Sequence, residues 1–285
     1  MDTWKKLSLA GLGTAGTTLG LSLWLGKRSW ENETRQRIES LKRSVSPEIR
    51  SSVSLESLDH LPEPVSRYFR FALSGDQAMI RSARIDHRGE FNMGGSWVPF
   101  TSVEYFSAEP PAFVWDARMK MNALMSVRVR DGYSAGQGSM VAKALGLYIV
   151  TEGDARNERL AEGALMRYLA EAVWLPTALL PSERLRWSPI DDSRAVATLT
   201  DLGLTVSLEF TFGDTGEITS VFSPERYMES GGEYRPVPWA GRFWDYREHD
   251  RMMIPEKAEV EWQLPEGTGP YWKGRLIDVD YEFAG

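Results

Sequence analysis

Hydrophobic and polar positions change their spacing along the chain, and each change predicts a different element. An uncharged run of 20 residues, Leu7 to Gly26, lies between the pairs Lys5-Lys6 and Lys27-Arg28. As a helix it would span about 30 Å, which matches the core of a bilayer. The run holds 7 Leu and 5 Gly, and Trp24 stands near one end, where an indole prefers the membrane interface. It therefore predicts one membrane-spanning helix.

After about Met79 the pattern has a period of two. Apolar and polar side chains alternate in short stretches, clearly so from Ala258 to Leu264, and Met93-Gly94-Gly95, Pro110-Pro111 and Asp131-Gly132 are turn signals. This pattern predicts an antiparallel meander. The expected strands are 80–91, 97–106, 113–121, 125–133, 138–150, 185–190, 195–200, 204–212, 218–227, 241–249, 258–264 and 271–283.

Two stretches have helical spacing instead. Pro62 and Pro64 precede an apolar stripe that runs from Val65 to Ala72, which predicts a short helix docked on the core within 58–73. A second helix is predicted over 157–175, ended by Pro176. Its apolar face carries Leu160, Ala161, Ala164, Leu165, Tyr168, Leu169 and Ala172.

These elements predict a mainly β fold. About twelve strands with one inserted helix favour a large curved antiparallel sheet or open half-barrel, because flat sheets of that size tend to curl. We expect residues 1–28 to form an N-terminal membrane anchor and residues 29–57 a solvated polar helix or linker. Residues 58–285 then form a single antiparallel β domain.

Charge and composition narrow the function classes. Residues 51–285 carry 24 Lys and Arg against 35 Asp and Glu, so this part is acidic and nucleic acid is not an expected partner. The chain has no cysteine, which excludes disulfides, thiolate catalysis and zinc–sulfur sites. Its histidines, His60, His87 and His249, lack metal-ligand spacing, and we expect neither a metal nor a cofactor.

The membrane segment leaves several alternatives. No small-x-small cleavage site follows the apolar run before Lys27, which favours an uncleaved single-pass anchor, in a bacterial inner membrane, over a signal peptide. Positive charges after the run favour a cytoplasmic domain, whereas a basic amino end also begins export signals, so the side of the membrane stays open. Gly16 and Gly20 have the spacing of a homodimer contact, although a glycine-rich helix without a partner is the simpler interpretation.

The best candidate for a catalytic carboxylate is Glu171. It lies four residues after Arg167 on the inserted helix, beside Tyr168 and Trp174, so it could sit in a sheltered pocket. An ion pair between Arg167 and Glu171 that ties the helix to the sheet is the structural alternative.

A basic strand pair is the candidate head-group contact. If residues 122–124 form a hairpin loop, Arg118 faces Arg128 and Lys120 faces Ser126, with Arg130 further along. Like charges directly opposed need acids or an anionic ligand to offset them. The other face of the same strands carries an adaptable apolar surface, which ordinary core packing would explain equally: Met119, Met121, Val127 and Val129.

Several sequence segments carry a family resemblance. These are LPEPVSRYFRFAL at 61–73, GSWVPF at 95–100, MRYLAEAVWLPTALLP at 166–181, and PEKAEVEWQLPEG followed by YWKG near the end. Residues 58–283 resemble a bacterial family of uncharacterised, often membrane-anchored proteins. The resemblance implies no activity. It implies a fold similar to the half-barrels of outer-membrane lipoprotein carriers and their receptor, where a curved sheet shelters acyl chains under a helix.

We therefore expect a membrane-tethered binding protein of the bacterial envelope, which holds a lipid or other apolar small molecule in a half-barrel cavity, with Trp174 in its wall. The alternatives are a carboxylate-dependent hydrolase and a structural or interaction scaffold at the membrane. No nucleophile elbow, histidine base or cofactor fingerprint supports an enzyme. The ligand itself is not specified, because a strand buried under a helix and a strand facing a lipid have the same periodicity.

Overall fold

The fold is one large curved antiparallel sheet, as predicted. The computed structural model describes residues 3–46, 52–54, 58–75, 77–122, 125–265 and 267–285, with side chains from Gly20 onward. Within them, thirteen strands form this sheet. They are β3 (Ile80–Met93), β4 (Ser96–Ser107), β5 (Ala112–Lys120), β6 (Ser126–Ser134), β7 (Gln137–Ala144), β8 (Tyr148–Glu152), β9 (Leu185–Pro189), β10 (Arg194–Asp201), β11 (Leu204–Phe212), β12 (Ile218–Ser230), β13 (Glu233–His249), β14 (Met252–Leu264) and β15 (Gly267–Phe283).

The strand order places the two halves of the chain side by side. Strands β3 to β8 run outward to one edge, and β9 to β15 return from the other edge, so β3 pairs with β15 in the middle. Every other pairing joins strands that follow each other in the chain, which is the arrangement that hairpins produce. A separate small sheet pairs β1 (Ser52–Val53) with β2 (Gln77–Ala78).

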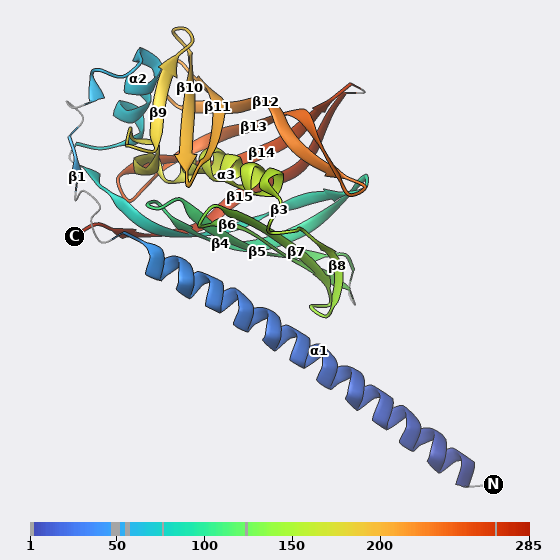
Figure 1. Cartoon of the computed structure of the whole chain (residues 1–285). Helices are drawn as coiled ribbons and strands as arrows, with labels where there is room; N and C mark the ends of the chain where they lie inside the picture. Colours follow the sequence, from blue (N-terminus) through green and yellow to red (C-terminus); the bar gives the residue numbers. More distant parts are fainter. Residues whose placement is uncertain (1–2, 47–51, 55–57, 76, 123–124, 266) are drawn as a thin grey trace.

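Three α-helices accompany the sheet in the described residues: α1 (Thr3–Ser44), α2 (Glu63–Ala72) and α3 (Glu158–Glu171). Asn157 caps α3 by accepting a hydrogen bond from the Arg159 amide. Two 3-10 turns, η2 (Ala172–Trp174) and η3 (Pro176–Leu179), follow α3. Figure 1 shows α3 between the two halves of the curved sheet and α1 outside them.

The core fills the space between α3 and the face of the sheet that curves around it, here called the inner face. Phe106, Phe113 and Phe210 extend from this face and are fully buried. At Gly138 helix α3 lies directly on β7, and an added Cβ would come within 2.6 Å of the Leu160 carbonyl oxygen. Glycine at this position therefore sets how closely the helix approaches the sheet.

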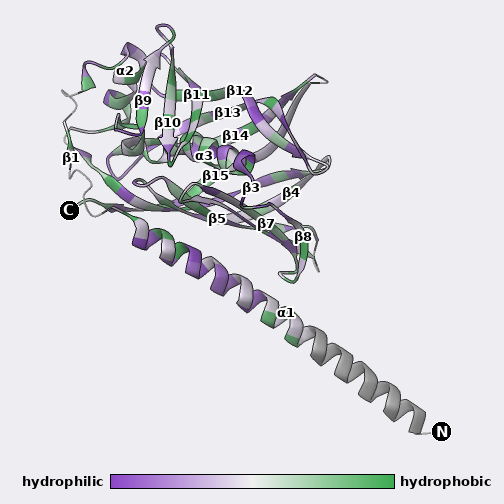
Figure 2. Cartoon of the chain, in the orientation of Figure 1, coloured by the Kyte–Doolittle hydropathy of each residue, from purple (hydrophilic) through white to green (hydrophobic). Residues whose placement is uncertain are grey.

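Within the segment expected as a solvated polar helix or linker, residues 29–44 are instead the docked half of α1. Trp30 is fully buried, and both its Nε1 and the Thr34 hydroxyl donate to Asp116 Oδ2, at 2.9 and 2.7 Å. Leu41 packs on Ala112 further along. These residues cover the outer face of β4 and β5, although most of the exposed turns are hydrophilic (Figure 2). The spacing of Trp30, Thr34 and Leu41 is that of one helical face, and charge along the rest of the helix obscured it.

Two strand boundaries differ from the prediction. The stretch 138–150 is not one strand, because Leu145 and Gly146 adopt φ of 53° and 73° and turn the chain from β7 into β8. Their apolar neighbours preserved the alternation and hid the turn. Asp131-Gly132, conversely, is no turn and lies inside β6.

Bulges also change which residues face inward. In β15 the pairing with β3 slips between Leu276 and Asp278. Leu276 is consequently buried, whereas Ile277, which alternation places with Val279 and Tyr281, is turned outward and exposed.

No helix in the part of the chain with described side chains is long and apolar enough to cross a membrane. The expected span, Leu7 to Gly26, lies mostly before Gly20 and so mostly outside that part. Gly16 also lies outside that part, so the homodimer contact through Gly16 and Gly20 stays a prediction. A Cβ added at Gly20 would meet no atom within 4 Å.

Candidate functional site

A large cavity lies on the inner face, between α3 and the strands of both halves of the sheet. Its volume is about 520 Å³, within the range of small-molecule sites. The apolar part of its wall is rich in aromatic and sulfur-containing side chains: Phe91, Met93, Trp115, Met119, Met140, Trp174, Met228, Trp239, Phe243, Trp262 and Trp272. Five polar or charged residues besides Thr151 and Tyr271 reach it: Asp131, Arg167, Glu171, Arg226 and Glu229.

Local sequence shapes this wall. Gly274 on β15 leaves the space that the Trp272 indole occupies, since a Cβ there would come within 2.2 Å of Trp272 Cη2. Trp272 also lies against Phe100 and His87, with ring centroids 5.7 and 5.9 Å away. These contacts hold the indole in place where it lines the cavity.

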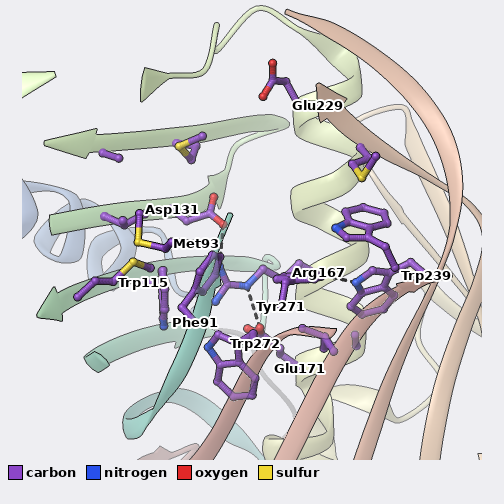
Figure 3. Close-up of a pocket in the computed structure, with 18 of the residues that line it drawn as sticks. Phe91, Met93, Trp115, Asp131, Arg167, Glu171, Glu229, Trp239, Tyr271 and Trp272 are labelled. Carbon is purple, nitrogen blue, oxygen red and sulfur yellow. Dashed lines mark hydrogen bonds and ion pairs between the residues drawn. The ribbon is translucent and has the colours of Figure 1, made fainter. Parts of the chain in front are cut away.

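The most highly charged part of the wall is a cluster around Arg167. Its guanidinium contacts Glu171 Oε1 through Nε at 2.8 Å, Asp131 Oδ2 through Nη1 at 2.7 Å and Glu104 Oε1 through Nη2 at 3.0 Å. Figure 3 shows Asp131 and Glu171 on either side of it. The ring of Trp115 lies 4.9 Å below the guanidinium carbon. One residue of α3 thus ties the helix to β4 and β6.

The charges in this cluster do not balance. Three carboxylates surround one guanidinium, and Glu104 is only 1% exposed. Burial, together with the negative charge of Glu171, raises the pKa of Glu104 well above its usual range. Burial opposes the charge of Arg167, but the carboxylates outweigh it and raise its pKa. Glu104 therefore favours its protonated form. The buried Oε2 of the neighbouring Glu171 has no hydrogen-bond partner in the described part of the chain.

His87 lies behind the wall. Its ring is 4.7 Å from Trp174, and neither ring nitrogen has a hydrogen-bond partner among the described residues. Burial, with a smaller contribution from the charge of Arg167, lowers the pKa of His87 to about 3. His87 is therefore a neutral aromatic ring that supports Trp174 and Trp272.

A second arginine, Arg226, reaches the cavity from the other half of the sheet. Its guanidinium carbon lies 4.7 Å from the ring centre of Trp239 and 5.4 Å from that of Trp262. Nη1 donates to the Tyr271 hydroxyl at 3.1 Å and Nη2 to the Gly163 carbonyl at 3.3 Å. The cation is thus held in an aromatic frame.

The basic strand pair lies on the other side of the sheet from this cavity. Arg118 does face Arg128, and Lys120 faces Ser126, as the hairpin predicted. Their side chains point to the outer face, where Arg130 stacks on Trp30 and binds Glu33 at 2.6 Å. A head group in the cavity therefore cannot meet Arg118, Lys120, Arg128 or Arg130, because alternation along β5 and β6 points them away. Helix α1 supplies the acids that offset the opposed charges.

The other predicted site residues are partly brought together. Met119, Trp174, Arg167 and Glu171 line the cavity, whereas Met121 packs at the margin of the core. The Tyr168 hydroxyl instead donates to the Ser107 and Ala108 carbonyls, both at 3.1 Å, so Tyr168 is not grouped with Glu171. Glu104 and Asp131 were not predicted as site residues from the sequence. Each stands at a position of its strand where alternation predicts an inward-facing apolar side chain, and a charged residue at such a position indicates a functional or structural role.

In the part of the chain that the structure describes, no group of histidine, aspartate and glutamate side chains has the geometry of a metal site. Each carboxyl group of the Arg167 cluster already has one oxygen in contact with the guanidinium. The acid–base chemistry that the cluster offers centres on the buried carboxyl group of Glu104, with Glu171 beside it at the cavity.

The solved structures that match the chain have low sequence identity to it. A DUF1329 family protein from Desulfovibrio piger has 11% identity and a TM-score of 0.40, covering 78% of this chain and 94% of its own. A putative outer membrane lipoprotein-sorting protein domain from Vibrio parahaemolyticus has 10% identity, a TM-score of 0.39 and coverages of 70% and 85%. A LolA superfamily protein from Nitrosomonas europaea has 12% identity, a TM-score of 0.31 and coverages of 81% and 94%.

No curated protein matches the chain in sequence. One family model does match, over residues 51–274, which include the residues of the cavity wall and the large sheet up to Gly274 in β15. The chain therefore belongs to DUF6544, a family of unknown function.

Proposed function

We propose that the chain is a membrane-tethered binding protein that holds a lipid or another apolar small molecule in the cavity between α3 and the inner face. The observation that carries this proposal is the wall itself. Apolar side chains that could pack on each other leave about 520 Å³ open instead. An apolar ligand in a cavity of this size stabilises the folded protein, because it supplies the van der Waals contacts that the wall side chains do not make with each other.

The kind of side chain in the wall supports an apolar ligand of variable shape. Met93, Met119, Met140 and Met228 line the cavity, and thioether side chains adapt to irregular surfaces. The rigid surfaces come from indoles. The cavity also reaches Val150 on the edge strand β8. Val150 is 59% exposed, so a ligand can enter beside that edge.

The tether is the uncharged run from Leu7 to Gly26. Where its side chains are described, Leu21, Trp24 and Leu25 are exposed, and Gly26 lies against Leu147 in the turn before β8. Tyr148 and Ile149 are exposed on the same strand. This continuity of apolar surface supports a membrane next to the β8 edge of the cavity. Carbonate extraction of bacterial membranes tests it: the chain should stay in the pellet with its amino end uncleaved by mass spectrometry, whereas a soluble or truncated chain would contradict the tether.

Lipid that copurifies with the full-length chain tests the binding function. We expect organic extraction and mass spectrometry to find about one bound apolar molecule per chain, at a level that the Val129→Trp variant reduces severalfold. Val129 lines the cavity, so an indole there takes up ligand space.

The matched control is Val196→Trp, on a polar-facing position of β10 that does not line the cavity. It should retain the ligand. An empty wild-type chain, or equal ligand in both variants, would contradict the proposed function.

A hydrolase is the second candidate, and the orphaned Glu171 Oε2 is the observation that favours it. This carboxylate lines an apolar cavity beside a neighbour, Glu104, that holds its proton. Such a pair has the form of a base next to an acid. If ester probes are hydrolysed, Glu171→Gln should abolish the reaction while lipid still copurifies; unchanged turnover would remove Glu171 from the reaction.

A further inference from the structure

Arg226 differs from the other cation of the cavity in lacking a counter-charge. Arg167 contacts three carboxylates, whereas no carboxylate of the described residues forms an ion pair with Arg226. Glu229 is the acid that lines the cavity on the same strand, and its Oε1 accepts the Gly232 amide at 2.8 Å instead. A cation that is partly removed from water without an acid nearby is costly unless another group supplies negative charge.

The hydrogen-bonding groups around Arg226 that are still free are all donors. Its buried Nε has no partner in the described chain. The Tyr271 hydroxyl accepts from Arg226 Nη1 at 3.1 Å and from Trp239 Nε1 at 2.9 Å, which occupies both of its lone pairs. The Tyr271 proton therefore points to an acceptor outside this group. A carboxylate or phosphate oxygen is the acceptor that also carries the missing charge.

The aromatic frame holds the Arg226 guanidinium in place at the cavity wall. Trp239 and Trp262 flank the guanidinium, and Tyr271 stacks on Trp262 with a 22° angle between the rings. These contacts keep Arg226 from leaving the cavity for solvent. Elsewhere in the cavity wall, Asp131 and Glu171 would repel an anion, so a ligand with one charged end has a preferred direction.

We propose that Arg226 and Tyr271 form an anion subsite in the cavity, and that the ligand is an amphiphile with an anionic head group on an apolar body. The head group, a carboxylate or a phosphate, lies at Arg226. The apolar part extends along Met119, Val127 and Val129 of β5 and β6. This inference rests on the proposed function, because it names the class of ligand that the same cavity takes.

Two probes test this inference. They share the same apolar chain and differ only in whether the polar end is a carboxylate or a hydroxyl. Hexadecanoic acid and hexadecan-1-ol, each with a photoreactive diazirine at the same carbon, are titrated onto the full-length chain in phosphatidylcholine nanodiscs. Wild type should bind the acid at least about tenfold more tightly, the effect of about one charge-assisted hydrogen bond. Dodecyl phosphate is added as an unlabelled competitor. If it displaces the acid, the site accepts both anionic head groups; if it does not, the site is specific for the carboxylate.

The variants separate this inference from general apolar binding. R226Q and Y271F should lower acid binding toward that of the alcohol and leave alcohol binding unchanged, which also shows that the cavity is folded. R226K should keep part of the preference. R118Q, the same change on the outer face, should behave as wild type.

Each other outcome has a definite meaning. If acid and alcohol bind equally, and R226Q changes neither, the anion subsite is wrong while the apolar cavity stands. If neither probe labels the wild-type chain above empty nanodiscs, the proposed function itself fails.

Discussion

Arg167 Nη2 on helix α3 lies 3.0 Å from Glu104 Oε1 on β4, and this contact joins the helix to a carboxylate buried in the middle of the sheet. Removing the cation leaves the carboxyl groups of Glu104, Asp131 and Glu171 without their shared counter-charge. We expect Arg167→Met to lower the free energy of unfolding by about 3 kcal/mol or more. Urea unfolding followed by circular dichroism measures it. Arg118→Met, on the exposed outer face, is the control, and a loss no larger than that of the control would show that the cluster does not hold α3.

The pH dependence of stability should carry the signature of Glu104. Folded Glu104 keeps its proton above its ordinary pKa of 4.5, chiefly because it is buried. Above that value the unfolded chain releases the proton first, so the folded state binds more protons and stability falls as pH rises through the window. Glu104→Gln should remove this contribution, up to about 1.4 kcal/mol per pH unit. Unfolding curves of both chains at a series of pH values test it; parallel pH profiles would contradict the protonated state.

His87 predicts the opposite slope at lower pH. Its pKa is about 3 in the folded chain and 6.5 ordinarily, so the unfolded chain binds the extra proton between these values. Stability is complete above pH 6.5 and is lost as pH falls toward 3. His87→Phe, which keeps a ring against Trp174, should flatten that part of the curve. If His87→Phe follows the same curve as wild type, His87 is not the buried base.

Docking of α1 should depend on Trp30 more than on its exposed neighbour Trp24. Trp30 is fully buried and Trp24 is 49% exposed. We expect Trp30→Ala to cost about 3 kcal/mol and to speed amide hydrogen exchange over residues 30–44, because loss of the indole leaves a cavity and removes one of the two donors to Asp116 Oδ2. Trp24→Ala should leave exchange over that stretch unchanged. Equal exchange in the two variants would mean that α1 does not dock through Trp30.

The alternation of apolar and polar residues was enough to predict most of the strands from sequence alone. It located the strands because each turns one apolar side to a common core, and the register of Arg118 with Arg128 followed from one hairpin. It failed wherever the backbone departs from regular pairing. The turn at Leu145-Gly146 needs left-handed φ that the neighbouring apolar residues conceal, and the outward Ile277 needs a bulge.

The site was less accessible from sequence for the same reason. Arg226 faces inward because β12 slips against β13 between Ser223 and Arg226; regular alternation would have turned Glu225 inward instead. Glu104 was within reach, since it stands in phase with Phe100 and Phe106. Which face of a sheet holds a cavity depends on what covers each face. Here α1 covers part of the outer face, and the sequence pattern does not show on which face a helix docks.

The central claim is that an amphiphile occupies the cavity, and tryptophan quenching tests it most directly. Five of the indoles, Trp115, Trp174, Trp239, Trp262 and Trp272, line the cavity. A hexadecanoic acid with bromine along its chain should quench the emission of the full-length chain saturably, and unbrominated hexadecanoic acid should restore it. Quenching that rises linearly with added acid and is not reversed by the competitor would contradict a bound ligand.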